Sequence, residues 1–500
     1  MTALNELVNR CGSAGQQRPW PRVTVDEAAW ALAAEQLAAQ RWSLLGLWGD
    51  DAQVHAAVRE ADAIAVLSFA CDPGGFPSLG RHHPPAIRLE RAIRDLFGFE
   101  PIGLADLRPW LDHGRWAASS PLRQGAPARS PAPPYRFLPA EGESLHEIPV
   151  GPVHAGIIEP GHFRFTANGE TVVRLEARLG YVHKGIERLM AGSDLSRGAT
   201  LAGRCSGDST VAYALAFARA AEAATGVEVP ARAHWLRALM AELERLANHL
   251  GDIGAVCNDA AFALMHTHCG ILREKVLRAA DACFGHRLMF DQILPGGVAR
   301  DLHARCGPTV RALVDRIRQR FPALVELYDN TASLQDRTVG TGILKPELAQ
   351  QYAAGGYIGR ASGRDFDARR TPGYPPYESL AFDVPMLEEG DVNARVWIRI
   401  HEVEQSLAIV EQLLDGLPSG PVRTELPDCE GEGIALVEGF RGDVLAWLSL
   451  GQDGKIRRCH LRDPSWFQWP LLEAVIEGNI VADFPLCNKS FNCSYSGHDL

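Results

Sequence analysis

The segment ARAHWLRALMAELERLANHL (Ala231–Leu250) gives the clearest indication of the fold. Its apolar residues recur every three or four positions and form one continuous stripe, which is typical of a helix with a buried face. Glu242, Arg245 and His249 share another face because they are spaced three and four positions apart. The segment therefore predicts a long helix with a polar network on its second face.

Helical patterns continue beyond this segment, and strand patterns precede it. Further helices are predicted over Asp208–Ala223, His266–Phe284 and Asp391–Leu417. Upstream, Val150–Phe165 and Glu170–Glu176 flank an Asn168-Gly169 turn, a pattern that predicts a β-hairpin. We therefore expect one large, mainly α-helical domain with a β-hairpin region over residues 145–500.

The N-terminal part has a different pattern and ends in a proline-rich stretch. Val54–Arg59 and Ala61–Cys71 read as strands, and Ile87–Phe97 reads as an amphipathic helix. Between Ser119 and Ser144 stand six prolines, which deny both helix and sheet. The predicted fold class is thus α+β, with a small α+β domain over 1–118 and an extended linker over 119–144.

Composition excludes several functions. The chain has 500 residues and a net charge of −11, which disfavours nucleic-acid binding because that binding depends on phosphate neutralisation. It contains no apolar run of the ~20 residues that a membrane-spanning helix needs, and its start lacks a signal-peptide pattern. We expect a protein on the cytoplasmic side, with membrane contact only through partners.

Eleven cysteines are scattered along the chain, and no two of them form a CxxC pair. Such pairs supply the usual thiolate ligands of zinc, iron–sulfur clusters and nickel. Most of these cysteines are therefore expected to be small buried hydrophobic residues.

Two regions resemble known families. The stretch HPPAIRLERAIRDLFGFEPIGLADLRPWL (His83–Leu111) resembles the signature of the C-type subunit of respiratory complex I. The second half resembles the D-type subunit of complex I and the large subunit of membrane-bound [NiFe] hydrogenases. The stretches that carry this second resemblance are GPVHAGIIEPGHFRF (Gly151–Phe165), MAELERLANHLGDIG (Met240–Gly254) and LRDPSWFQWPLLEAVIEGNIVADFP (Leu461–Pro485). The chain looks like the fused large subunits of formate hydrogenlyase and hydrogenase-4-like complexes.

The resemblance implies four positions where hydrogenases hold nickel and iron with thiolates. We place them at Ala202, Cys205, Ser465 and Gln468, which would line the former metal cavity. Three of the four thiolates are absent, and alanine, serine and glutamine are poor ligands for these soft metals. The sequence therefore predicts that the chain binds no nickel–iron centre, and in fact no cofactor of its own.

The same resemblance suggests residues that move protons or contact an acceptor. Glu159 occupies the place of a proton-transferring loop glutamate, where apolar surroundings would raise its pKa. His162 could donate to a carbonyl or shuttle a proton. His154 matches the first of two loop histidines near the complex I quinone, but the second histidine and the quinone tyrosine have no counterpart. Without the family, these loop residues would read as a solvated surface turn.

Several polar residues have two interpretations that the sequence leaves open. Asp208 and Asp463 could relay protons or could cap helices and shape turns. The cluster Arg360, Arg364, Asp367 and Arg369 is either a salt-bridge cluster or a rim that faces a partner.

These observations predict the large subunit of a membrane-associated, energy-converting oxidoreductase complex, similar to hydrogenases and to NADH:quinone oxidoreductase. By resemblance, its partners are a small subunit with a [4Fe–4S] cluster, a ferredoxin-like subunit and antiporter-like membrane-arm subunits. Proton-coupled electron transfer would take place in the cavity, with a quinone as one candidate acceptor. A non-catalytic scaffold is the main alternative, and a nickel hydrogenase with unusual ligands is a third.

Overall fold

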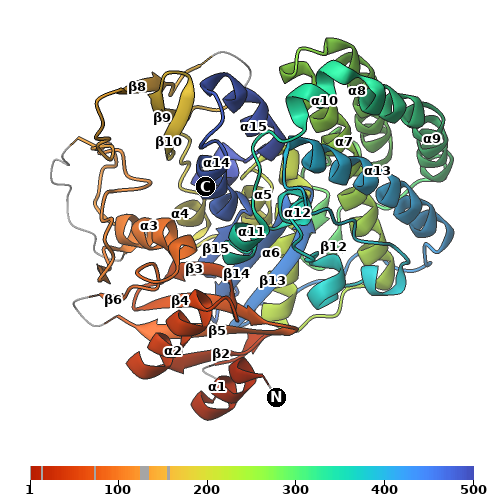
Figure 1. Cartoon of the computed structure of the whole chain (residues 1–500). Coiled ribbons are helices and arrows are strands. Elements are labelled where there is room, and N and C mark those ends of the chain that lie inside the picture. Colours follow the sequence, from red (N-terminus) through yellow and green to blue (C-terminus); the bar gives the residue numbers. More distant parts are fainter. Residues whose placement is uncertain (1, 13–14, 72–74, 124–133, 155–157) are drawn as a thin grey trace.

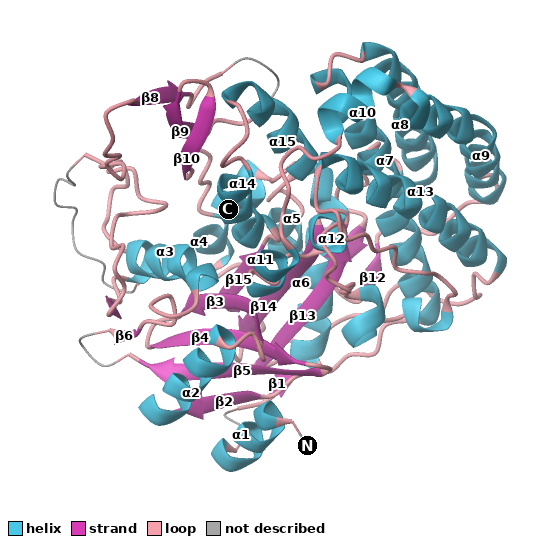
Figure 2. Cartoon of the chain, viewed as in Figure 1, coloured by secondary structure: helices cyan, strands magenta, loops and turns pink. Residues whose placement is uncertain are grey.

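The computed structural model describes residues 2–12, 15–71, 75–123, 134–154 and 158–500. Figure 1 shows an N-terminal sheet with its helices on one side, a stack of long helices on the other, and a central sheet between them. Mixed helices and strands confirm the α+β class (Figure 2). Among the described residues, no helix is both long and apolar enough to cross a membrane.

The N-terminal region is a four-stranded sheet in the order β2-β5-β4-β3, covered by helices. Its helix α3 has the predicted bounds and ends at Gly98, whose φ of +74° is the left-handed geometry that glycine favours at a helix C-terminus. The bounds of these elements are α1 Ala3–Cys11, β2 Arg22–Val25, α2 Glu27–Ala38, β3 Ser43–Gly49, β4 Gln53–Glu60, β5 Ala63–Ala70 and α3 Ile87–Phe97. Two short strands, β6 Phe76–Pro77 and β7 Pro101–Ile102, pair beside them.

The predicted hairpin is present, but its first strand is shorter than expected. Strand β9 (His162–Asn168) pairs with β10 (Thr171–Arg178), while β8 (Leu145–Val150) adds a third antiparallel strand. The strand predicted over Val150–Phe165 is therefore wrong in its first half. Pro152 and Pro160 lack an N–H group and cannot continue a β ladder there. Residues 155–157 lie outside the described part of the chain.

A central sheet crosses the large region, and the sequence patterns did not predict it. Strands β13 (Gly431–Gly439), β14 (Gly442–Leu450) and β15 (Ile456–Arg462) are antiparallel, and β1 (Gln17–Arg18) from the N-terminal region joins β13 in parallel. Nearly every residue of β13 and β14 is buried. A strand buried on both faces has no alternation of polar and apolar residues, so periodicity could not reveal it.

Long helices form the other side of the molecule. The predicted helix is present as α7 and extends nine residues beyond the predicted end. The bounds are α4 Ile186–Met190, α5 Leu195–Ala202, α6 Thr210–Thr225, α7 Ala231–Asp259, α8 Ala263–Phe284, α9 Cys306–Asn330, α10 Ala332–Thr338, α11 Pro346–Gln351, α12 Gly356–Arg360 and α13 Val392–Asp415. The remainder are α14 Ser465–Val475, α15 Phe484–Phe491, α16 Tyr495–Asp499 and the short pair β11 Ile293–Leu294 and β12 Gly297–Val298.

Buried charges join α7, α12, α13 and β13. We call this group the ion network, and it consists of Glu242, Arg245, His249, Arg360, Asp367, Arg369, Glu402 and Glu438. Glu402 is at its centre, because its carboxylate accepts from His249 at 2.6 Å, and Arg360 and Arg245 contact it as well. Arg360 also binds Glu438 at 2.9 Å. The predicted polar face of α7 is thus real, and the arginine-rich segment belongs to a buried salt-bridge cluster rather than to an exposed rim.

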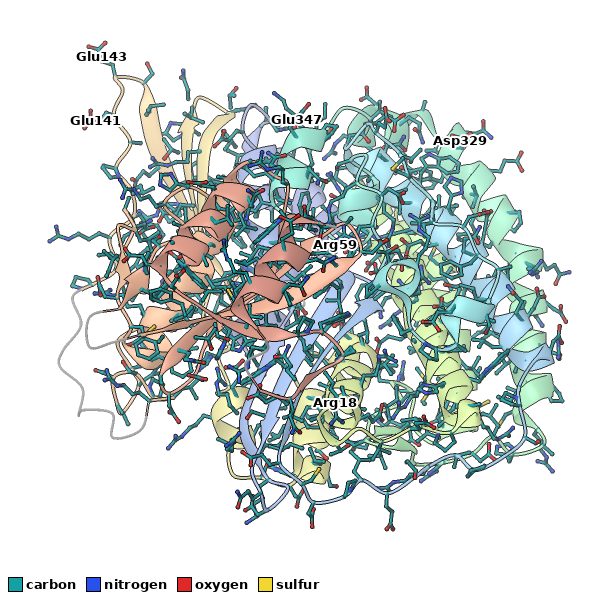
Figure 3. All side chains as sticks on the ribbon, turned by 90° about the horizontal axis from the view of Figure 1, so that it is seen from below. Arg18, Arg59, Glu141, Glu143, Asp329 and Glu347 are labelled. Atoms are coloured by element: carbon teal, nitrogen blue, oxygen red, sulfur yellow. The ribbon has the colours of Figure 1, made fainter. Side chains whose placement is uncertain are left out.

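The segment between the two regions contains no helix or strand over residues 134–144, and residues 124–133 of the predicted linker lie outside the described part. Tyr135 donates to Glu176 at 3.2 Å, so the end of this segment contacts β10. Figure 3 shows Glu141 and Glu143 at the outer edge and Arg59 well inside the molecule. Arg59 lies 4.5 Å from the centre of the Phe366 ring, which ties the N-terminal sheet to the large region.

Candidate functional site

The four predicted former ligand positions are all packed inside the protein. Ala202 ends α5, Cys205 follows in the next turn, and Ser465 and Gln468 occupy the first turn of α14. Each of the four has 0% of its surface exposed. A side chain with no accessible surface borders no water-sized space, so in this structure the four positions are filled and do not line an open cavity.

Hydrogen bonds nevertheless bring the early and late segments together. The hydroxyl of Ser494 lies 3.2 Å from that of Ser206, and the backbone N–H of Ser494 donates to the hydroxyl of Ser465 at 2.9 Å. We call these three residues the serine bridge. Sequence reasoning missed Ser494, although the density of hydroxyl residues in NCSYSGHDL (Asn492–Leu500) was a usable signal.

Gln468 takes no part in the serine bridge. Its amide donates to the carbonyl of Arg441 at 2.8 Å, while its amide oxygen has no hydrogen-bond partner among the described residues. Gln468 therefore secures the turn between β13 and β14 and does not face Cys205 through any hydrogen bond of the structure.

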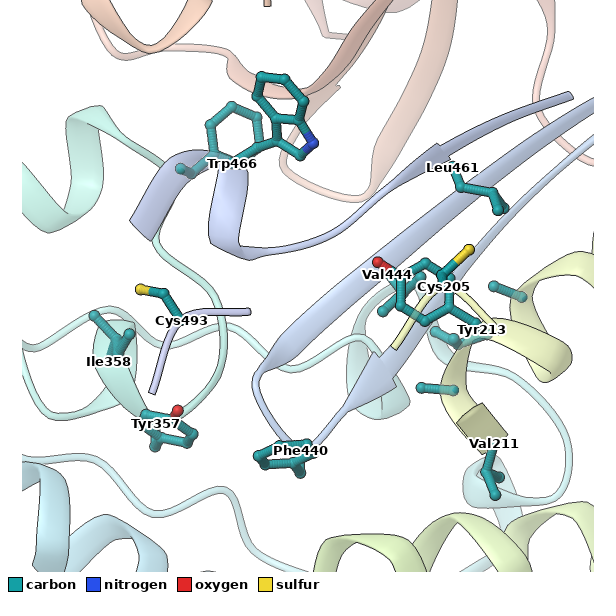
Figure 4. Packing of buried hydrophobic residues seen from close by; sticks show 14 of the residues in the cluster. Cys205, Val211, Tyr213, Tyr357, Ile358, Phe440, Val444, Leu461, Trp466 and Cys493 are labelled. Atoms are coloured by element: carbon teal, nitrogen blue, oxygen red, sulfur yellow. The ribbon is translucent and has the colours of Figure 1, made fainter. Parts of the chain in front are cut away.

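Cys205 carries the sole sulfur among the four positions, and its environment opposes metal binding. Its thiol donates to the carbonyl of Leu201 at 3.7 Å, and burial raises the pKa of the thiol, so the neutral form is retained. Figure 4 shows Cys205 beside Tyr213, whereas Cys493 lies on the side of Tyr357. Among the described residues, no group of three or more His, Cys, Asp and Glu side chains could hold a metal ion. The donor set does not fit a nickel–iron centre.

Asp463 lies directly beside the serine bridge. It accepts from the hydroxyl of Tyr213 at 2.7 Å and from the backbone N–H of Ser465 at 2.8 Å. Burial and the adjacent Asp463 both raise the pKa of Tyr213 well above its ordinary value. Asp463 thus shapes the turn at the start of α14 and also holds a buried tyrosine in its protonated form.

Asp208 connects the serine bridge to the surface. It accepts from the hydroxyl of Ser206 at 2.6 Å and pairs with Arg441. Although burial opposes the effect, the Arg441 guanidinium lowers the pKa of Asp208 to about 2. The Asp208 side chain keeps 37% exposure, so solvent partly screens this attraction. A chain of hydrogen-bonding oxygens therefore runs from Ser494 through Ser206 to a carboxylate that water can reach.

Asp208 does not cap helix α6. The first N–H groups of α6, on Val211 and Ala212, donate to the carboxylate of Glu244 from α7 at 2.7 and 3.1 Å. Burial raises the pKa of Glu244 to about 8 despite these two hydrogen bonds. The capping role considered for Asp208 thus belongs to a glutamate 33 positions further along the chain, which local sequence patterns could not identify.

Glu159, His162 and His154 occupy different surroundings. Glu159 is exposed rather than enclosed by apolar residues, and its carboxylate accepts from the backbone N–H of Ser496 at 2.8 Å and from the Ser496 hydroxyl. His162 instead contacts the carbonyl of Gly151 at 3.1 Å, and burial lowers its pKa. The Nε2 atom of His154 has no partner in the described part. Glu159 therefore connects to the C-terminal segment beside the serine bridge, whereas no hydrogen bond of the described residues joins either histidine to it.

The comparisons with known proteins agree with this architecture. Residues 259–430 match the family described as the 49 Kd subunit of respiratory-chain NADH dehydrogenase, and residues 23–132 match its 30 Kd subunit. A solved archaeal structure, the membrane-bound sulfane sulfur reductase (MBS), matches with a TM-score of 0.68 and 28% identity, covering 72% of this chain and 99% of that chain. The class of protein is therefore a fused complex I-type large subunit.

Relatives with known names define the family more closely. Formate hydrogenlyase subunit 5 of Escherichia coli is 33% identical over 85% of this chain and 77% of its own length. Hydrogenase-4 component G of the same organism is 33% identical over 86% and 76%. The D-type subunit of NADH-quinone oxidoreductase from Syntrophobacter fumaroxidans is 31% identical over 70% and 95%. The chain belongs to this family and is a large subunit of an energy-converting, hydrogenase- and complex I-like oxidoreductase complex.

Proposed function

We propose that this chain supports proton-coupled electron transfer at the site around the serine bridge, without a nickel–iron centre. The observation that carries the proposal is the Ser494 hydroxyl, which lies between the two former ligand segments at 3.2 Å from Ser206. Hydroxyl and carboxyl groups in contact can pass protons, whereas they are poor ligands for soft metals.

Protons would reach this site by two routes. On one side, Ser206 and Asp208 connect Ser494 to solvent. On the other, Glu159 binds Ser496 two residues further along the same C-terminal segment. Each electron that arrives needs a balancing proton, and two separate carboxylates at the surface can supply it.

Electrons would come from a partner, because the described residues offer no metal site of their own. In keeping with the names of its relatives, we assign this chain to a respiratory membrane complex. The partners are an iron–sulfur small subunit with a [4Fe–4S] cluster, a ferredoxin-like subunit and antiporter-like subunits of a membrane arm. The acceptor is a small molecule, with a quinone or a sulfur compound suggested by the relatives' names, and the complex faces the cytoplasm.

The test is Glu159→Gln in the assembled complex, with Glu147→Gln as the matched control. Glu147 is an exposed carboxylate of the neighbouring strand β8 that pairs with Arg164. Glu159→Gln should slow electron transfer to the acceptor about tenfold or more and change its pH profile, because proton delivery contributes rate factors of roughly 10²–10⁴. Glu147→Gln should remain within about twofold of the unmodified complex. Unchanged transfer in an intact Glu159→Gln complex would refute the proposal.

A second candidate function is a non-catalytic scaffold, which the packing favours. All four former ligand positions are fully buried, so in this structure no acceptor could reach them. In that case the large region would only hold partners in place. Substituting Asp208→Asn together with Glu159→Gln distinguishes the two functions, because a scaffold would lose neither turnover nor its pH dependence while assembly stays intact.

A further inference from the structure

A separate cavity of about 330 Å³ lies where the N-terminal sheet meets the large region. One wall is the apolar face of α3, with Leu89, Ala92 and Ile93, and the opposite wall includes Trp116 and Leu122. None of Ala202, Cys205, Ser465 and Gln468 lines this cavity. Its volume falls at the small end of the range for small-molecule sites, about 300–1,000 Å³.

The inner end of the cavity carries two stacked rings. The rings of Trp48 from β3 and His460 from β15 lie 4.9 Å apart and 13° from parallel, and both residues line the cavity. The Nε1 of Trp48 and the Nε2 of His460 are buried and have no hydrogen-bond partner among the described residues. A buried polar atom without a partner costs free energy, so a ligand that pairs with it gains affinity.

The proton positions on His460 follow from its other neighbour. Its Nδ1 lies 2.8 Å from the carboxylate of Glu187, which Arg458 also binds at 2.8 Å. Burial opposes ionisation of Glu187, yet Arg458 and His460 lower its pKa to about 2, so the carboxylate is ionised and accepts a proton-bearing Nδ1. Since burial lowers the pKa of His460, its ring is neutral and Nε2 is an acceptor.

The cavity therefore offers one donor, the Trp48 N–H, and one acceptor, the His460 Nε2. A hydroxyl group satisfies both at once because it accepts one hydrogen bond and donates another. Phe97, Trp116 and Trp466 add aromatic surfaces to the walls, and aromatic ligands pack well against such rings. We propose that this cavity is a binding site for a small phenolic ligand, with its ring between the apolar walls and its hydroxyl at Trp48 and His460. This inference goes beyond the proposed function and does not depend on it.

The test measures binding of 2-naphthol and of naphthalene to the full-length chain by tryptophan fluorescence and calorimetry. Naphthalene has the same ring system without the hydroxyl, so the ratio of the two affinities reports the hydroxyl alone. The unmodified chain should bind 2-naphthol more tightly. In Trp48→Phe the indole N–H is lost while an aromatic ring remains, and this ratio should fall about fivefold.

A second variant places the ligand in this cavity. Ala92→Phe fills the space from α3 and should abolish binding of both compounds, whereas Ala31→Phe on the exposed side of α2 should leave binding unchanged. Equal binding of the two compounds, or full binding by a folded Ala92→Phe chain, would overturn the proposal. Binding that disappears in the assembled complex would also overturn it, because a partner subunit would then fill the cavity. Since every readout is binding, the result is independent of electron transfer.

Discussion

The ion network and the serine bridge are both fully buried polar groups, but they differ in charge. The ion network combines four carboxylates, three arginines and a histidine in direct contact. The serine bridge consists of three neutral hydroxyls, with the charged pair of Asp208 and Arg441 at its edge. Both groups join segments that are distant in the sequence.

This difference shows which group can change during evolution without loss of the fold. A buried charge that loses its partner costs several kcal/mol, so each member of the ion network depends on the others. Replacing a neutral hydroxyl costs about 1 kcal/mol. The former ligand region can therefore exchange thiolates for alanine, serine or glutamine within one fold, while the ion network maintains the arrangement of α7, α12, α13 and β13.

The largest effect is expected from Glu402→Gln in the ion network. The substitution leaves Arg245 and Arg360 without their shared carboxylate, so the free energy of unfolding should fall by about 3–5 kcal/mol. Chemical denaturation measures this change. Glu411→Gln on the same helix removes a half-exposed partner of Arg318 and should cost less than about 1 kcal/mol. Similar costs for the two variants would contradict the role given to the ion network.

The cap of α6 should make stability depend on pH. The folded pKa of Glu244, about 8, lies above its ordinary value of 4.5, so between these values the folded state binds more protons. The free energy of unfolding should therefore fall as pH rises through this window, by about 2–4 kcal/mol from this one group. In Glu244→Gln this contribution should vanish, whereas Glu347→Gln, an exposed control in α11, should keep it. Parallel pH profiles for the natural chain and Glu244→Gln would show the assignment to be wrong.

A smaller effect is expected beside the serine bridge. Tyr213→Phe removes the hydroxyl that donates to Asp463, leaving a buried carboxylate with fewer donors, at a cost of about 1–3 kcal/mol. Thermal unfolding at neutral pH measures this cost. Tyr181→Phe, at a tyrosine that is 37% exposed, should change stability by less than about 0.5 kcal/mol. A neutral Tyr213→Phe would mean that Asp463 is satisfied by other groups.

The smallest effect is expected for the remaining sulfur. Cys205→Ala removes one buried atom and a weak hydrogen bond to Leu201, so stability should fall by about 1 kcal/mol. Electron transfer by the assembled complex should stay within about twofold, as it should for Cys429→Ala at a half-buried site. A Cys205→Ala complex that loses electron transfer altogether would indicate that the thiol takes part in the redox step.

Local patterns predicted those elements whose exposed and buried residues alternate with the helical period. Helix α3 has its predicted bounds, and α7, α8 and α13 begin within three residues of the predicted positions. The central sheet was missed because burial on both faces removes the alternation on which strand prediction depends. For the site, the sequence located the turn at Cys205 and the turn at Asp463, but neither Ser494 nor Glu244 could be found, since their partners are 288 and 33 positions away.

The sequence by itself determined the α+β class, the family and the absence of thiolates at three expected positions, because these depend on residue identity and on short-range periodicity. Tertiary structure alone decided that the former ligand segments meet through Ser494, that Glu244 caps α6, and that Trp48 and His460 stack at the end of a cavity. Each of these contacts joins residues from separate elements, and only the packing of the complete chain determines which buried donors find an acceptor.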